Sequence, residues 1–124
     1  DLEEEPHRLV PVLRAILTPP EEVRRRAERL AEMLRGSGLE LEVRPERSAV
    51  GGGSLPGQEL PSWAVCLRHP GLSAQELARR LRAAEPPVLG RVRDERLVLD
   101  LRGVEDAELS LIAGALRDIM TGGC

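Results

Sequence analysis

The spacing of apolar residues changes several times along this 124-residue chain, and the order of those changes limits the fold more than any other feature. Spacings of three and four residues indicate helices, whereas strict alternation and short apolar runs indicate strands. The predicted order is helix, strand, strand, helix, strand, strand, helix, with the last helix beginning near Glu105. This order predicts an α+β two-layer sandwich, in which a mostly antiparallel four-stranded sheet carries helices on one face.

Two capping boxes predict where the first two helices begin. In the first, Thr18 is the expected N-cap, Pro19 occupies the first helical position, and Glu21 completes the box. The second box, Ser73–Glu76, opens the middle helix. The apolar face of the first helix carries residues at helical spacing: Val23, Ala27, Leu30 and Leu34.

Four short segments have the patterns expected of strands. They cover residues 39–43, 63–67, 88–92 and 97–101. The first strand is expected to end before a long loop over residues 45–57. A short turn at Asp94 and Glu95 is expected to join the last two strands into a hairpin.

Trp63 is the only aromatic residue of the chain, which contains no Phe and no Tyr. We expect Trp63 to be largely buried, so that Trp63→Ala would cost roughly 3–5 kcal/mol. Proteins that bind single-stranded nucleic acid need aromatic faces for base stacking. Their absence here, together with a net charge of −3, argues against an RNA-recognition sheet or an OB-fold.

All 18 basic residues are Arg, and this excludes one class of chemistry within the chain. A Schiff base to pyridoxal phosphate requires a lysine amine. His7 and His69 have no Cys or carboxylate partners at ligand spacing, so no metal site is expected. Cys66 and Cys124 are too few for a disulfide scaffold, and Cys66 is expected to pack as a small hydrophobic residue.

No apolar run approaches the roughly 20 residues that span a bilayer. We therefore expect no membrane association and a cytoplasmic location. The chain begins at Asp1 without an initiator Met, and we expect it to be part of a longer protein.

Two features are candidate binding elements, each with an alternative. Gly51, Gly52, Gly53 and Ser54 could form an anion-binding nest of backbone amides, or simply a flexible surface loop. Arg102, at the end of the last strand, could grip a carboxylate or phosphate, or form an ordinary surface ion pair. The arginines at 24–26 are interleaved with glutamates and are expected to form a solvated helix face.

Several segments together resemble one known family, the C-terminal domain of bacterial selenocysteine synthase, L-seryl-tRNA(Sec) selenium transferase. The resemblance extends from about Leu9 to Leu116. It rests on the Ser-Ala-Val-Gly-Gly-Gly-Ser-Leu-Pro-Gly segment at 48–57 and on residues 11–14, 24–30, 60–65, 86–91 and 97–102.

The resemblance implies the small C-terminal domain of a fold-type I enzyme that depends on pyridoxal phosphate. The cofactor lysine would lie in a large domain outside this chain. Residues 1–17 would then be a junction and residues 18–124 the small domain, with Leu9–Leu17 as the expected contact with the large domain. The small domain would bind no metal or cofactor, be inactive alone, and direct Gly51–Ser54 and Arg102 towards the active site.

The implied parent converts seryl-tRNA(Sec) to selenocysteinyl-tRNA(Sec) with selenophosphate, and we expect it to be a homo-oligomer. Two alternatives stay open at this point. One is a free-standing ferredoxin-like binding or regulatory module, because fold order alone does not separate such a module from an enzyme domain. The other is the small domain of a related enzyme acting on another amino-acid or sugar-acid substrate.

Overall fold

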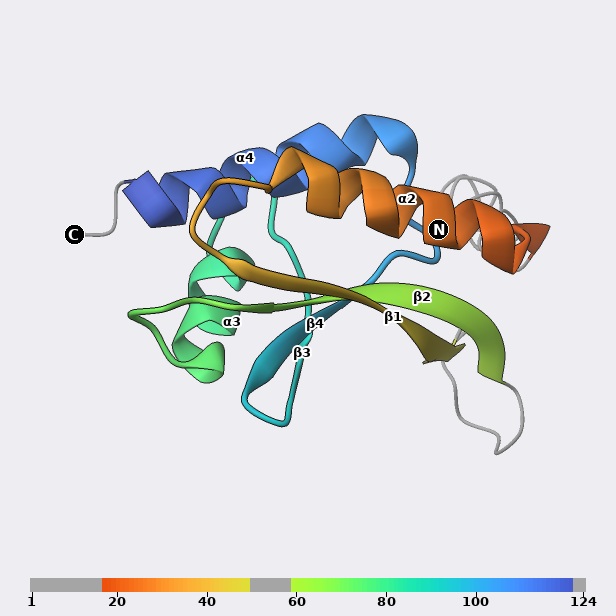
Figure 1. The fold of residues 1–124 in the computed structure, drawn as a ribbon, viewed down its shortest axis with the longest axis horizontal. Helices are drawn as coiled ribbons and strands as arrows, with labels where there is room; N and C mark the ends of the chain where they lie inside the picture. Colours follow the sequence, from red (N-terminus) through yellow and green to blue (C-terminus); the bar gives the residue numbers. More distant parts are fainter. Residues whose placement is uncertain (1–16, 50–58, 122–124) are drawn as a thin grey trace, which may run out of the picture.

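The computed structural model describes residues 17–49 and 59–121. The strands pair in the order β1-β2-β4-β3, and each pair is antiparallel. The predicted α+β sandwich is confirmed, with helices on one face of the sheet (Figure 1). Its elements are α2 (Pro20–Met33), β1 (Glu40–Ala49), β2 (Glu59–Arg68), α3 (Ala74–Arg82), β3 (Arg91–Arg93), β4 (Arg96–Asp100) and α4 (Asp106–Thr121).

The start of α2 differs from the prediction. Pro19 is the N-cap with φ −65° and ψ 149°, and no side chain caps the helix. The predicted Thr18 cap is therefore wrong. The reason is the second proline, since the ring of Pro20 keeps the preceding residue out of helical conformation, and the helix cannot begin before Pro20 itself.

Strands β1 and β2 are longer than predicted, because both continue through a proline. Pro45 pairs with Trp63, although it was predicted to begin a loop, and Pro61 pairs with Arg47, although it lies before the predicted strand 63–67. Proline is tolerated at a sheet edge, where its missing N–H is not needed for pairing. β1 is an edge strand, and β4 pairs with β2 only at residues 64–67. Each proline therefore lies where its own strand is paired on one side only.

The predicted hairpin is confirmed as β3 and β4, although β3 is shorter than expected. Asp94 and Glu95 have φ of 53° and 61°, as a two-residue turn of this kind requires. Gly90 precedes β3 at a point of close approach. A Cβ there would lie 2.8 Å from side-chain atoms of both Leu97 and Leu99.

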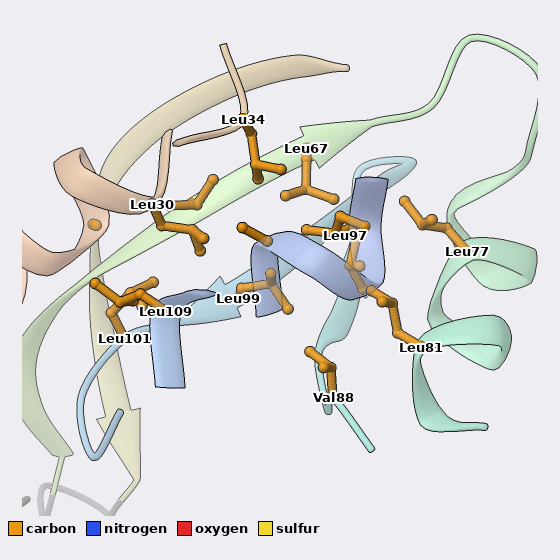
Figure 2. Close-up of a cluster of buried hydrophobic side chains, with 14 of the residues drawn as sticks. Leu30, Leu34, Leu67, Leu77, Leu81, Val88, Leu97, Leu99, Leu101 and Leu109 are labelled. Atoms are coloured by element: carbon orange, nitrogen blue, oxygen red, sulfur yellow. The ribbon is translucent and has the colours of Figure 1, made fainter. Parts of the chain in front are cut away.

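The core is built almost entirely from leucine and valine between the sheet and the three helices. Side chains from all three helices point towards those of β2 and β4 (Figure 2). Leu97, Leu99 and Leu101 occupy alternate positions along and just after β4 and face this cluster. Ala64, Cys66 and Val98 form a second, small buried cluster, because alternation directs them to the opposite face of the sheet.

Trp63 lies at the edge of the core rather than at its centre. Its side chain is only partly buried against the leucine cluster, and the guanidinium of Arg24 stands 4.7 Å from the ring centroid. The expectation of a largely buried anchor therefore needs correction. We expect Trp63→Ala to cost less than the 3–5 kcal/mol of a fully buried aromatic residue.

Helices α2 and α4 run side by side in the same direction across the sheet (Figure 1). Arg26 in α2 links this helix to the segment just before α4 by donating to the carbonyl oxygen of Val104 at 2.6 Å. At the other end, the guanidinium of Arg117 donates to the carbonyl oxygen of Met33. These bonds satisfy carbonyl groups that have no partner within a helix.

The leucine core predicts that substituting a buried leucine lowers the free energy of unfolding far more than substituting an exposed one. Leu30 is fully buried, whereas Leu17 is 75% exposed. Leu30→Ala should lower the free energy of unfolding by about 2–5 kcal/mol, because it leaves a cavity among packed side chains. Chemical denaturation monitored by circular dichroism measures this change. The control Leu17→Ala should alter the midpoint little, and equal losses for the two variants would contradict the described core.

The predicted cap of α3 is confirmed, and it generates a pH prediction. Ser73 Oγ accepts a hydrogen bond from the N–H of Glu76 at 3.1 Å. The Glu76 carboxylate accepts hydrogen bonds from Arg79 and Arg80, which lower its pKa from 4.5 to about 2. A carboxyl with a lowered pKa stabilises the fold above its unfolded-state pKa, and this contribution is lost as the pH falls.

The stabilisation from Glu76 should therefore disappear between pH 4.5 and about 2. An NMR titration of the Glu76 carboxyl should give a midpoint near 2, and Arg79→Gln should raise it. The Glu76→Gln variant should lose less stability than the parent chain across this window. A midpoint near 4.5 in the parent chain would show that these ion pairs do not form in solution.

Candidate functional site

Arg102 follows β4 and is held in a buried turn. Its side chain is only 8% exposed, and its backbone N–H donates to Asp100 Oδ1 at 3.0 Å. The same carboxylate oxygen accepts a hydrogen bond from Ser62 Oγ at 2.6 Å. The Leu101 side chain is buried in the core, and its N–H donates to the carbonyl oxygen of Trp63 at 3.1 Å. This packing fixes the backbone from which Arg102 projects.

The guanidinium of Arg102 joins two segments that are distant in sequence. Nη1 donates to the carbonyl oxygen of Thr18 at 2.7 Å, and Nη2 donates to the carbonyl oxygen of Pro61. Burial lowers the pKa of Arg102, and the charge of Asp100 opposes that shift. The planar guanidinium suits this position because its donors are arranged in a rigid fork. Arg102 therefore ties the start of α2 to the beginning of β2 and the end of β4.

The second candidate element, Gly51, Gly52, Gly53 and Ser54, lies outside the described residues. The strand ends on either side of it are described. β1 ends at Ala49, which pairs with Glu59 at the beginning of β2. Pro61, which accepts the hydrogen bond from Arg102, lies two residues further along β2. The structure thus brings Arg102 to the strand ends that flank residues 50–58.

The face of the sheet away from the helices carries a network of ion pairs that the sequence interpretation missed. Glu46 on β1 pairs with Arg91 at 3.2 Å and with Arg93 at 2.5 Å, both on β3. Glu42 pairs with Arg96 at 2.6 Å. The alternation of apolar and charged residues over 39–44 predicted a half-buried strand, which gave Glu42 a solvent-facing position but left Glu46 in the predicted loop. The partners of both glutamates could be found only from the strand order.

Partial burial of Glu46 by itself would raise the pKa of its carboxyl, but hydrogen bonds from Arg93 and from the N–H of Arg47 lower it overall. The same face contains Cys66, which is 3% exposed. Burial raises the pKa of the Cys66 thiol. A buried thiol of raised pKa is a poor nucleophile, so the expectation that Cys66 packs as a small hydrophobic residue is confirmed.

The other charged and histidine side chains considered from the sequence form hydrogen bonds or ion pairs within the chain where the structure describes them. His69 Nδ1 accepts the N–H of Gly71 at 2.8 Å, and His7 lies outside the described residues. Arg24 pairs with Glu28, and Arg25 pairs with Glu22. Over residues 17–49 and 59–121, no three His, Cys, Asp or Glu side chains are grouped as they would be around a metal ion. None of the helices in these ranges is long and apolar enough to cross a bilayer.

The chain does not fit covalent binding of pyridoxal phosphate. Its 18 basic residues are all Arg, so it provides no lysine amine for a Schiff base. Partly buried hydrogen bonds from Arg102 join the beginning of β2 to the start of α2.

Comparison with known proteins gives a consistent result. The family model for L-seryl-tRNA selenium transferase matches residues 2–105. The chain is 40% identical over 113 residues to the L-seryl-tRNA(Sec) selenium transferase of Aquifex aeolicus, covering 90% of this chain and 25% of that protein. It is 47% identical over 116 residues to the enzyme of the same name from Hyphomonas neptunium, covering 93% of this chain and 25% of the relative.

A third relative, the L-seryl-tRNA(Sec) selenium transferase of Moorella thermoacetica, is 41% identical over 116 residues and is again covered to 25% of its length. The chain thus spans about a quarter of the length of the curated relatives it matches. The family match covers most of the chain, and the resemblance inferred from its motifs is confirmed. This chain belongs to the L-seryl-tRNA selenium transferase family.

Proposed function

We propose that this chain is the small C-terminal domain of an enzyme that converts seryl-tRNA(Sec) to selenocysteinyl-tRNA(Sec), with selenophosphate as the selenium donor. The observation that carries the proposal is the family match over residues 2–105. Relatives named as L-seryl-tRNA(Sec) selenium transferases, 40% and 47% identical, support it. In this proposal residues 1–17 are the junction with a larger domain, and residues 18–124 are the small domain.

Family membership favours this transferase over a free-standing binding module and over a related enzyme acting on another substrate. Because the proposed enzyme works with aminoacyl-tRNA, we place it in the cytoplasm. We also expect it to be a homo-oligomer. Its pyridoxal phosphate would be held by the larger domain, because this chain has no lysine. We assign no cofactor contact and no bond-making step to the residues of this chain.

We assign Arg102 a positioning role towards that active site. Its hydrogen bonds to Thr18 and Pro61 hold together the entry into α2 and the beginning of β2. The strand ends next to Pro61 carry residues 50–58. In the proposed enzyme, Arg102 and the segment Gly51–Ser54 face the larger domain, and Arg102 fixes the base from which this segment extends.

The positioning role of Arg102 can be tested by a conservative substitution, because it requires two donors in the forked arrangement of a guanidinium. Lysine keeps the positive charge but offers a single ammonium, which is not matched to two carbonyl groups on different segments. A misplacement of about 1 Å away from the reacting atoms can lower turnover by about 100-fold. Arg102→Lys should therefore impair the full-length enzyme even though the charge is preserved.

The first test measures kcat and KM for selenium transfer in the full-length enzyme, together with thermal unfolding. Arg102→Ala and Gly52→Val should each lower kcat by roughly 10–100-fold. Arg102→Ala should also lower the melting temperature, because it removes two partly buried hydrogen bonds and a side chain that is itself buried. The matched control is Arg91→Ala on the opposite face of the sheet, which should leave kcat unchanged.

Arg102→Ala can lower kcat either by displacing the segment that Arg102 positions or by destabilising the fold. Arg102→Lys and Gly52→Val decide between these two causes. Both should lower kcat at temperatures where the variants remain folded. If both retained the parent kcat, neither Arg102 nor the glycine segment would contribute to the active site.

A second test concerns the 124-residue chain alone. Mixed with pyridoxal phosphate and treated with borohydride, it should form no covalent adduct on an internal side chain, because it contains no lysine. It should also leave seryl-tRNA unchanged. The full-length enzyme serves as the positive control for aldimine absorbance. A stoichiometric internal adduct on the 124-residue chain, located by mass spectrometry, would overturn the assignment of the cofactor to the larger domain.

A further inference from the structure

A groove runs between α4 and the connection from α3 to β3. It consists of two neighbouring hollows of about 240 Å³ and 640 Å³, which share Pro86 and Leu111 in their walls. The smaller hollow is lined mainly by apolar residues, among them Val88, Leu89, Val104 and Ile112. The larger one extends along α4 past Gly114 to Ile119.

Two leucines on the walls of the groove are exposed in this chain. Leu89 is 74% exposed and Leu111 is 53% exposed. Exposed apolar surface of this kind costs about 25 cal/mol per Å² relative to burial. The remaining large exposed hydrophobic residues of the described ranges, Leu17 and Val92, do not line either hollow. A hollowed apolar patch with exposed leucines is the usual mark of an interaction surface.

Gly114 adds a second observation on the floor of the groove. It lies inside α4, where glycine costs about 1 kcal/mol relative to alanine. A Cβ at this position would meet no atom within 4 Å, so packing within the described chain does not require glycine here. Its absence of a side chain leaves room for close approach from outside.

One end of the groove lies close to the first described residues of the chain. Arg102 binds Thr18, and residues on both sides of Arg102 in sequence, Leu101 and Val104, line the smaller hollow. Leu17, the first described residue, is 75% exposed at this entry point. The polypeptide that precedes Leu17 is therefore joined to the described domain at a point near the smaller hollow.

We propose that the groove is the surface on which the rest of the full-length polypeptide packs. This inference rests on the proposed function, in which the chain is one domain of a longer enzyme. The curated relatives are about four times as long as the matched segment, so a large part of the same polypeptide is available as the occupant. The occupant presents an apolar ridge, with Leu89 and Leu111 closing over its sides.

A second copy of this chain fits the groove less well. A two-fold dimer would place groove against groove, and two concave surfaces do not fill one another. Filling the groove with another face of a second copy would need an apolar ridge. Outside the groove, the large exposed hydrophobic residues of the described ranges are the single residues Leu17 and Val92.

The experiment compares hydrogen exchange in the 124-residue chain and in the full-length enzyme. Amides of residues 88–92 and 108–116 should exchange about tenfold more slowly in the full-length protein, because docking adds to their protection. Amides of residues 40–44, in the half of β1 far from Gly51–Ser54 and at the sheet edge opposite β3, are the internal reference. Equal exchange at the groove in both proteins would overturn the inference.

Substitutions provide an independent test. Leu111→Asp and Leu89→Asp should leave the melting temperature of the 124-residue chain nearly unchanged, since both side chains are already exposed. In the full-length enzyme they should lower the melting temperature and restore fast exchange at the groove. Gln75→Asp, the same change of charge at an exposed position of α3 outside the groove, is the control.

The outcomes separate the inference from the proposed function. A full-length protein with a protected groove but no selenium transfer would refute the function and support the docking surface. A full-length protein with selenium transfer and an unprotected groove would refute the docking surface alone. A concentration-dependent dimer of the 124-residue chain that Leu111→Asp abolishes would identify a second copy as the occupant and overturn the inference.

Discussion

The structure depends above all on the alternation of side chains along β4. Leu97, Leu99 and Leu101 face the helices and form the centre of the leucine core (Figure 2). The same alternation puts Asp100 on the other side, where it binds Ser62 and the backbone of Arg102. One strand thus packs three helices and also fixes the turn from which Arg102 projects. A shift of register by one residue would exchange the two faces and lose both functions together.

The two faces of the sheet are stabilised differently. The helix-covered face excludes water with leucine and valine. On the other face, Ala64, Cys66 and Val98 are buried without a covering helix. Ion pairs of Glu42 and Glu46 with arginines of β3 and β4 cross this face. The aliphatic stems of such side chains can cover apolar surface while their charged ends remain solvated.

Arginine also makes the contacts that join element ends. Arg26, Arg102 and Arg117 each donate to backbone carbonyls of distant segments. Carbonyls at the ends of helices and strands lack partners within their own element, and an arginine can satisfy them while its stem packs against apolar neighbours. In a chain without lysine, these arginines serve the architecture, whereas the smaller hollow beside α4 is lined mainly by apolar residues.

The sequence alone determined the fold class, because the periods of its apolar residues differ between helices and strands and do not depend on distant contacts. It also determined the Ser73 cap and the hairpin turn, which are local, and its motifs identified the family. Pro45 and Pro61 could not be placed in strands without knowing which strands lie at an edge. The partial burial of Trp63 likewise depends on how α2 crosses the sheet.

The candidate site divides in the same way. The position of Arg102 at the end of β4 followed from the alternating pattern of residues 97–101. Its carbonyl partners at Thr18 and Pro61 lie 84 and 41 residues away, and only the packed structure brings them together. The groove also required tertiary structure, because its walls come from α4 and from the connection after α3. Local pattern decides which residues face inward, whereas contacts between distant segments depend on how whole elements pack.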